Sequence, residues 1–256
     1  MKPLAGWNAA AGPIFPKVEE LQGMMRGKTQ GVLVCLVILA AIPAFCQRGT
    51  FGIDVGQSSD KFGSLPAVSG LVVGIDGEIT ILKANKKEGG ASIVAGGEIR
   101  LPSDTGSHAK EFAIFGGPGF QYRNLTIEVH AQIRKIYLPT GNVDNQYFVR
   151  NKMEVLEIPL VLRYRFGPGG RLFLEAQGAP EFSPRWRSAG SLSPLPNPNF
   201  DHGYFVRGGL GYIFGKWYAK GTYESRYFKF NANQFNPNGL YNWRTNAITG
   251  GAGFVF

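Results

Sequence analysis

Apolar and polar residues alternate along most of the chain from Thr50 to the last residue. A period of two is typical of a β-strand whose two faces meet different surroundings. The segments that carry it are bounded by Gly, Pro, Asn and Ser, which favour turns. The pattern predicts ten strands: Thr50–Gln57, Leu71–Leu82, Ala91–Leu101, Phe112–Arg123, Leu125–Tyr137, Val155–Phe166, Arg171–Phe182, Tyr204–Phe214, Lys216–Phe228 and Asn246–Phe256.

The connections between these strands alternate in length. Those after even-numbered strands are short, with the exception of 83–90, and those after odd-numbered strands are longer. Short periplasmic turns and long external loops are typical of outer-membrane barrels, whereas a soluble sandwich has no reason to sort its loops in this way. We therefore predict an all-β fold, an antiparallel up-and-down transmembrane β-barrel of about ten strands, with eight as the alternative. Both termini are then expected in the periplasm.

The C-terminal strand carries apolar residues at alternate positions and ends in an aromatic residue. Ile248, Gly250, Ala252, Phe254 and Phe256 share one face, and Phe256 is the last residue. This arrangement resembles the C-terminal signal by which outer-membrane proteins are recognised for barrel assembly. The region 47–256 resembles small barrels of the OmpA/OmpX type and the broad outer-membrane β-barrel domain family. The resemblance implies that the barrel assembly machinery is a partner, which binds the strand ending at Phe256.

One segment, Val32–Phe45, is continuously apolar, and at fourteen residues it is too short to cross a membrane as a helix. It follows two basic residues and ends in Pro43-Ala44-Phe45-Cys46, which together are typical of a secretory signal peptide. We predict a signal peptide at 24–46, cleavage after Cys46 and a mature barrel domain at 47–256. A buried core helix and a lipoprotein anchored at Cys46 are the weaker alternatives. Residues 1–23 lie outside the signal pattern, and we interpret them as a gene-start artefact or an N-terminal extension.

Composition agrees with a barrel and excludes some chemistry. Glycine supplies 36 of the 256 residues and aromatic residues 13%, which suits a sheet protein with many tight turns. A mean hydropathy near zero argues against helical spans but not against strands with one polar face. Both cysteines, Cys35 and Cys46, fall in the predicted signal peptide. The mature chain is therefore expected to have no disulfide and no thiolate ligand, and we predict no cofactor and no metal.

The predicted outward face carries almost no charge in mid-strand, as contact with lipid requires. Its aromatic residues gather near the strand ends, which predicts two girdles at the level of the lipid headgroups. The external girdle would contain Phe112, Tyr137, Tyr204, Tyr227 and Trp243, and the periplasmic girdle Tyr122, Phe166, Phe214, Trp217 and Phe256.

The predicted inward face carries acidic and basic residues in equal number, which indicates ion pairs across a narrow interior. Arginine is the commoner base, and its forked donors suit paired bonds to carboxylates. The acids are Asp54, Asp76, Glu78, Glu98, Glu128, Glu157, Glu175, Glu181 and Glu224. The bases are Arg100, Arg123, Arg134, Arg163, Arg165, Arg171, Arg207, Lys220 and Arg226.

The mature chain has 23 basic and 16 acidic residues, so its excess positive charge must lie in loops, turns and strand ends. Binding of anionic outer-membrane lipids is one interpretation, and solvated surface charge is the one we favour. Nucleic acid is excluded as a partner because no platform of aromatic and basic residues is present. We expect a monomer. The bases expected near external lipid phosphates are Arg150, Lys152, Arg185, Arg187, Lys229 and Arg244.

Few residues are candidates for catalysis. His130, with Glu128 and Arg134 nearby, could act as a general base, but we favour a structural role in the lumen. Asp201 and His202 form the one adjacent Asp–His pair, in or beside an external loop. We name no catalytic residue and expect a non-enzymatic barrel with a structural or surface-binding role. A small passive pore and an outer-membrane lipid-modifying enzyme or protease are the alternatives.

Overall fold

The computed structural model describes residues 48–256 except 84–88, 105, 140–151, 188–198 and 233–238. The predicted signal peptide at 24–46, its cleavage site at Cys46 and the segment 1–23 lie outside the described residues. So does Arg150, which was expected near lipid. None of the helices among the described residues has the length and apolar character needed to span a membrane.

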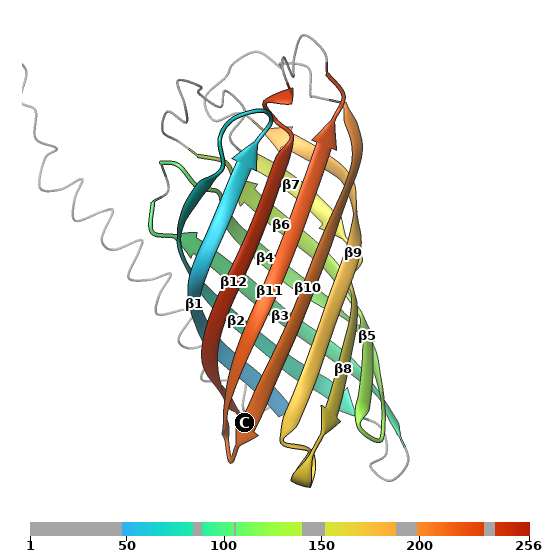
Figure 1. The fold of residues 1–256 in the computed structure, drawn as a ribbon. Helices are drawn as coiled ribbons and strands as arrows, with labels where there is room; N and C mark the ends of the chain where they lie inside the picture. Colours follow the sequence, from blue (N-terminus) through green and yellow to red (C-terminus); the bar gives the residue numbers. More distant parts are fainter. Residues whose placement is uncertain (1–47, 84–88, 105, 140–151, 188–198, 233–238) are drawn as a thin grey trace, which may run out of the picture. The chain divides into compact units, whose positions relative to one another are not determined.

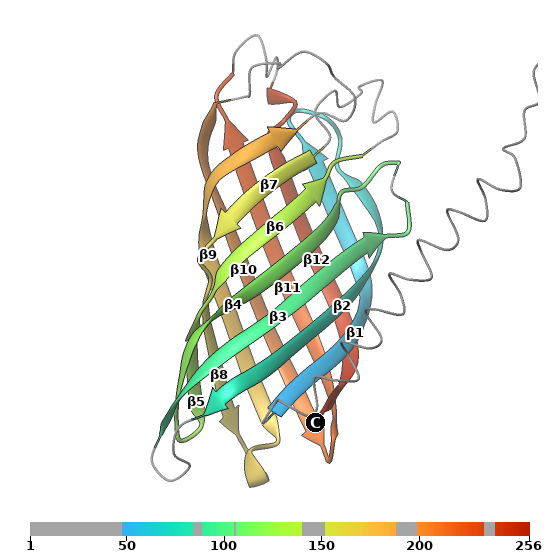
Figure 2. The ribbon, with the colours of Figure 1, turned by 180° about the vertical axis from the view of Figure 1, so that it is seen from behind.

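Twelve strand segments make up one antiparallel sheet (Figures 1 and 2). In chain order they are β1 (Arg48–Phe62), β2 (Val68–Lys83), β3 (Gly90–Pro102), β4 (Lys110–Tyr122), β5 (Leu125–Val129), β6 (Ala131–Tyr137), β7 (Lys152–Glu157), β8 (Leu160–Phe166), β9 (Leu172–Arg187), β10 (Phe200–Phe214), β11 (Trp217–Phe230) and β12 (Trp243–Val255). A single 3₁₀ turn, η1 (Pro168–Gly170), connects β8 to β9.

Two pairs of these segments are halves of single strands, so the barrel has ten strands. β5 and β6 both pair with β4 and are separated only by His130, whereas β7 and β8 both pair with β9. The second break falls at Ile158-Pro159, because proline has no N–H to donate to the ladder. The N–H of His130 donates to the Pro159 carbonyl at 3.0 Å, which holds the two breaks side by side.

Neighbouring strands in the chain are neighbours in the sheet, and the sheet closes. β12 pairs with β1 from Thr50↔Val255 to Phe62↔Trp243, and β9 pairs with both β8 and β10. The predicted up-and-down barrel of ten strands is therefore confirmed, and the alternative of eight is wrong. We call the end that holds Phe256 and the short connections 123–124, 167–171 and 215–216 the turn end, and the opposite end the loop end.

The strands extend further at the loop end than the sequence pattern predicts. β1 continues to Phe62, β10 begins at Phe200 and β12 begins at Trp243. Asp60 and Glu111, which fall in predicted loops, therefore lie on strands and point inward. The alternation was hidden there because the inward residues include large apolar side chains such as Phe62, Phe228 and Phe230.

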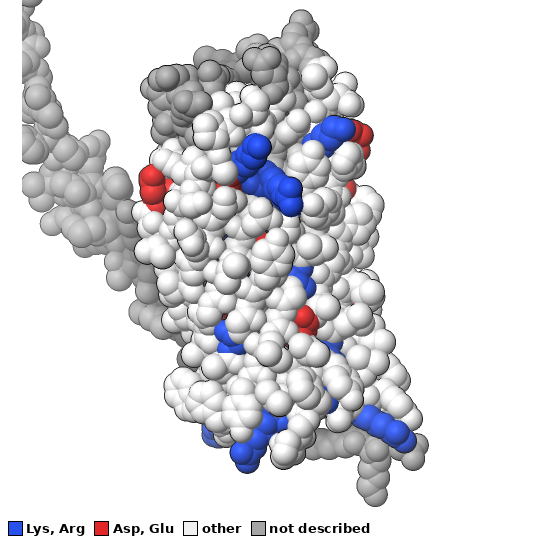
Figure 3. Space-filling view, viewed as in Figure 1, with Lys and Arg blue, Asp and Glu red and all other residues white. Residues whose placement is uncertain are grey.

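The outward face is apolar along the barrel wall, as predicted. Ile114 and Ile248 in mid-strand are each 67% exposed. Figure 3 shows a mostly uncharged wall, with the largest basic patches toward the two ends. Lys135, near the loop end, is a charged residue that points outward and is half exposed. Such a surface suits lipid rather than water.

The aromatic residues follow the predicted girdles with one correction. At the turn end, Tyr122, Phe214, Trp217 and Phe256 are exposed on the outward face. Trp243, predicted in the external girdle, is instead buried inside the barrel at 1% exposure. Trp243 is the first residue of β12, and its side chain faces inward. The sequence pattern did not predict this, because it placed the start of the strand at Asn246.

Candidate functional site

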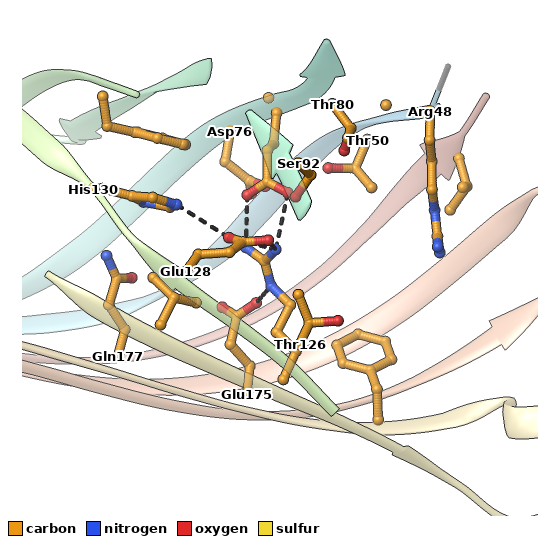
Figure 4. A pocket seen from close by; sticks show the side chains of 18 of the residues that line it. Arg48, Thr50, Asp76, Thr80, Ser92, Thr126, Glu128, His130, Glu175 and Gln177 are labelled. Carbon is orange, nitrogen blue, oxygen red and sulfur yellow. Dashed lines mark hydrogen bonds and ion pairs between the residues drawn. The ribbon is translucent and has the colours of Figure 1, made fainter. Parts of the chain in front are cut away.

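The lumen gathers most of the ionisable side chains of the described residues, and Arg163 lies at the centre of one cluster. Figure 4 labels two of its partners, Glu128 and Glu175. Its Nε is 2.6 Å from Glu175 Oε2 on the neighbouring strand β9. Its Nη1 bonds to Glu128 on β5, and both Nη atoms bond to Glu78 at 2.9 and 2.6 Å. Glu78 is on β2, three strands beyond the β5–β6 strand that β8 pairs with, so this bond crosses the lumen.

A second cluster crosses the lumen between β3 and the strands β10 and β11. Arg207 on β10 bonds to Glu98 on β3 at 2.6 Å and to Glu224 on β11 at 2.7 Å. Arg100 on β3 bonds to the same Glu224 at 2.7 Å. Arg100 Nε also lies 2.9 Å from Glu98 Oε1, so Glu98 and Glu224 are each contacted by both Arg100 and Arg207.

A third cluster lies deeper in the protein and is closed to solvent. Arg134 bonds to Glu157 and Glu111, and Arg226 bonds to Glu111 from the opposite wall at 3.0 Å. Arg134, Arg226 and Glu157 have no exposed surface. The guanidinium groups of Arg134, Arg207 and Arg226 surround the ring of one inward residue, Phe205, at 4.5 to 5.7 Å from its centroid. Buried charges of this kind must be paired, since an unpaired one is strongly unfavourable.

Most predicted lumen residues point inward, and the exceptions have a common cause. Arg123 and Arg171 are exposed in turns rather than in the lumen, because the strands end one residue short of them. Arg165 lines the cavity near the turn end. Since Asp60 and Glu111 enter the lumen while Arg123 and Arg171 leave it, the interior is more acidic than the balanced face that the sequence predicts.

Above the ion pairs, the loop end of the lumen is filled by apolar side chains. Trp243 lies between Phe62 and Phe228 in near-parallel stacks, with centroids 6.4 and 5.7 Å away. The Trp243 Nε1–H donates to Asp60 Oδ1 at 3.0 Å, so its polar atom is satisfied. The buried members of this cluster are Phe62, Ile136, Leu138, Met153, Val155, Phe228, Phe230, Tyr241 and Trp243. The lumen is therefore dry at this end within the described residues.

The turn end of the lumen holds a cavity of about 180 Å³ (Figure 4). Three inward aromatic side chains approach glycines of nearby strands so closely that a Cβ there would collide with them. Phe173 covers Gly211, and Tyr218 covers both Gly52 and Gly253. Phe115 covers Gly96 in the same way. The cavity lining includes Arg48, Thr50, Thr80, Ser92, Gln121, Thr126 and Arg165 toward the strand ends, and Arg163, Glu128, Glu98 and Arg207 farther in.

His130 belongs to the Arg163 cluster, as its structural interpretation predicts. Its Nε2 lies 3.0 Å from Glu128 Oε2, and its ring stacks on Phe115 with centroids 4.7 Å apart. Donor atoms of Glu78, Glu128 and His130 lie within 4.8 Å of one another, a spacing that could hold a metal ion. However, Arg163 already bonds to both carboxylates, and His130 Nδ1 has no partner among the described residues. Ligating histidines usually donate that second N–H to a partner, so the group fits an ion-pair cluster better than a metal site.

The structure brings together an Asp–His pair that sequence analysis missed. His108 Nδ1 lies 2.9 Å from Asp60 Oδ2, although the two residues are 48 positions apart. Both are 2% exposed, and the ring also hydrogen-bonds to the backbone of Ser69. The bond to Asp60 is the main cause that raises the pKa of His108. Because the ring is held on both sides and buried, it has no free nitrogen to activate a substrate.

The Asp–His pair that the sequence does show is an exposed surface group. Asp201 and His202 lie at the start of β10, with His202 Nδ1 3.3 Å from Asp201 Oδ2. Lys229 on β11 is 3.2 Å from the same carboxylate oxygen. The arrangement is an ion pair with a neighbouring imidazole, and it has no pocket of its own among the described residues.

No protein-family model matches the chain, and no curated protein matches it. Three solved barrels are similar in structure. The outer-membrane protease OmpT from Escherichia coli is 12% identical with a TM-score of 0.42, over 82% of this chain and 97% of that chain. Ail, the attachment invasion locus protein of Yersinia pestis, is 11% identical with a TM-score of 0.29, over 82% and 98%. The β domain of the Bordetella autotransporter BrkA is 13% identical with a TM-score of 0.36, over 81% and 98%. At these values the similarities assign neither a family nor an activity.

Proposed function

We propose that this chain is an integral β-barrel of the bacterial outer membrane that does not conduct ions steadily. Its role is structural or surface-binding through the external loops, and it is not an enzyme. In this proposal the turn end faces the periplasm, the signal peptide is removed near Cys46, and the resemblance to small barrels of the OmpA/OmpX type extends to a filled interior. The barrel is a monomer whose partners are outer-membrane lipids and the assembly machinery.

The observation that carries the proposal is the series of ion pairs that cross the lumen. Arg163–Glu78, Arg207–Glu98 and Arg226–Glu111 each join walls that are not neighbours in the sheet. A barrel of this size has an interior that side chains can fill. An ion would have to pass three charged clusters and then the apolar cluster around Trp243. The outward apolar wall supports a membrane location, because a soluble protein seldom exposes so large an apolar surface.

The first experiment tests the location. The protein should be recovered in the outer-membrane fraction and should migrate differently on a gel before and after heating, because a folded barrel resists detergent. N-terminal sequencing of that protein should begin at Gln47. Recovery as a soluble periplasmic protein would overturn the barrel proposal, and a different first residue would overturn the cleavage site alone.

The second experiment tests closure. Purified protein in a planar lipid bilayer should give small or intermittent currents. A large, steady current would favour the alternative of a small passive pore. The cavity at the turn end is the observation that favours this alternative, because side chains leave this part of the lumen unfilled. Hydrolysis of lipopolysaccharide or peptide substrates by the purified barrel would favour the enzyme alternative instead.

A further inference from the structure

The charged residues in the described turns of the turn end are all basic. Arg123 lies in the turn between β4 and β5, Arg171 follows η1, and Lys216 lies between β10 and β11. All three side chains are exposed. Among the described residues, no carboxylate forms an ion pair with any of them. We call these three exposed bases of the described turns the basic rim (Arg123, Arg171 and Lys216).

Bases at the loop end are arranged differently, since acids lie among them. Lys135 and Lys152 approach Glu154 at 4.0 and 3.4 Å. Lys229 approaches Asp201 at 3.2 Å. Acidic residues are thus interspersed with the bases at the loop end, whereas the described turns of the turn end carry bases alone.

Arg123 occupies a backbone position that does not suit it. Its φ is +50°, and it is the one non-glycine residue with positive φ among the described residues. Tyr122 pairs with Leu125, so Arg123 and Asn124 form a two-residue hairpin turn in which Asn or Gly is favoured at such positions. A left-handed conformation is unfavourable for a residue with a side chain beyond Cβ, other than Asn or Asp. A strained residue that could easily be replaced by Asn indicates that the guanidinium group has a use at this site.

Two bases of the basic rim, Arg123 and Lys216, lie next to aromatic residues of the turn-end girdle. Arg123 follows Tyr122, with its guanidinium group 5.3 Å from the centroid of the ring. Lys216 lies between Phe214 and Trp217, which are both exposed on the outward face. Aromatic rings of this kind lie at the level of the lipid headgroups, so a base one residue farther out reaches the phosphate layer. A base at this level is attracted to an anionic membrane surface.

We propose that the basic rim binds the phosphate groups of anionic phospholipids in the periplasmic leaflet of the outer membrane. This inference rests on the proposed function, in which the turn end faces the periplasm. The chemistry is that of a phosphate diester with net negative charge, as in phosphatidylglycerol. Zwitterionic lipids carry a compensating ammonium group and should bind the rim more weakly.

The test uses the full-length protein purified from outer membranes and returned to vesicles of two compositions. One is pure phosphatidylcholine, and the other is three parts phosphatidylcholine to one part phosphatidylglycerol. The midpoint of urea unfolding should be higher in the anionic vesicles. The variant R123Q/R171Q/K216Q should lose more than half of this increase. The matched control K135Q/K152Q/K229Q removes the same charge at the loop end and should keep most of it.

A single substitution separates charge from turn geometry. Asn tolerates positive φ, so Arg123→Asn should be at least as stable as the wild type in phosphatidylcholine. In anionic vesicles its midpoint of urea unfolding should rise less, relative to phosphatidylcholine, than that of the wild type. Equal increases for the wild type and the rim variants would overturn the inference. Equal losses in the two triple variants would also overturn it, because they would show a general effect of net charge.

Two further outcomes identify the source of failure. If inorganic phosphate added to phosphatidylcholine vesicles raises the midpoint as much as phosphatidylglycerol does, the rim binds free phosphate and the lipid assignment is wrong. If the protein inserts into neither vesicle and shows no heat-modified gel form, the proposed function fails. If it inserts into both with equal midpoints, only the lipid inference fails.

Discussion

Arg163 on β8 and Glu78 on β2 meet across the lumen, with Nη2 of the arginine 2.6 Å from Oε2 of the glutamate. The same guanidinium group also bonds to Glu128 and Glu175, so this side chain connects β8 with β2, β5 and β9. Its removal would leave three carboxylates facing one another at the deep end of the cavity. The lumen would then gain both space and negative charge.

Arg163→Ser should therefore open the lumen and weaken the fold. We expect larger currents in planar bilayers and a shift of ion selectivity toward cations. Loss of one member of a buried ion cluster costs about 3 kcal/mol or more, so the thermal transition should fall. Arg244→Ser is the matched control, because it makes the same replacement at an exposed position of β12 outside the lumen. A steady large current in the native protein, unchanged by Arg163→Ser, would contradict closure by ion pairs.

Phe256 should be required for assembly. Its backbone forms two hydrogen bonds with Gly49, at 2.9 and 3.0 Å, which close β12 against β1. Deletion of Phe256, or Phe256→Asp, should leave unassembled protein in the periplasm, measured as loss of the heat-modified form. Phe256→Tyr keeps the aromatic ring and should assemble normally. Normal insertion of the Asp variant would show that the terminal residue is not part of an assembly signal.

The His108–Asp60 pair should make stability depend on pH. The pKa of His108 in the folded protein is raised above that of the unfolded chain, chiefly by its hydrogen bond to Asp60. Protonated His108 therefore stabilises the fold fully below the unfolded pKa, near 6.5, and this contribution is lost as pH rises through the folded pKa. The urea midpoint should fall between about pH 6 and pH 8. His108→Gln should flatten this dependence, and an unchanged pH profile in that variant would contradict the assignment.

Gly253 and Gly250, on the same strand, should respond differently to a methyl group. A Cβ at Gly253 would meet the Tyr218 ring and the Phe51 carbonyl, whereas one at Gly250 would meet nothing within 4 Å. Overpacking of this kind costs about 1–3 kcal/mol. Gly253→Ala should lower the urea midpoint clearly, and Gly250→Ala should leave it nearly unchanged. Equal effects would mean that the close approach of Tyr218 does not constrain the lumen wall.

The strand pattern could be predicted from the sequence because alternate side chains of a membrane barrel face lipid and lumen, and the two sets differ in polarity. Ile53 faces outward and Asp54 inward, as the pattern predicts. The pattern failed at the loop end, where large apolar side chains such as Phe62 and Phe228 face inward. Trp243 was misassigned there, since an inward tryptophan and a girdle tryptophan look alike in sequence.

Partners inside the lumen could not be predicted in the same way. The alternation along each strand predicts that Arg163 and Glu78 face inward. It does not predict that they lie at the same height along the barrel axis, because that height depends on strand tilt and register. The pair His108–Asp60 has no sequence signal at all, since one residue lies on a strand and the other in a loop. The turn bases Arg123 and Arg171 were assigned to the lumen because a strand boundary was placed one residue too far.

The cross-lumen pairs also bear on how the barrel forms. Arg207 on β10 and Arg226 on β11 pair with carboxylates that come early in the chain. These are Glu98 on β3 and Glu111 on β4. An open sheet that lacks its last strands leaves these groups in water, where unpaired charges are tolerated. They become mutually satisfied only when the two edges meet and water is expelled. Closure of the barrel should thus be a single cooperative step, in which no partly closed species with a dry interior is stable.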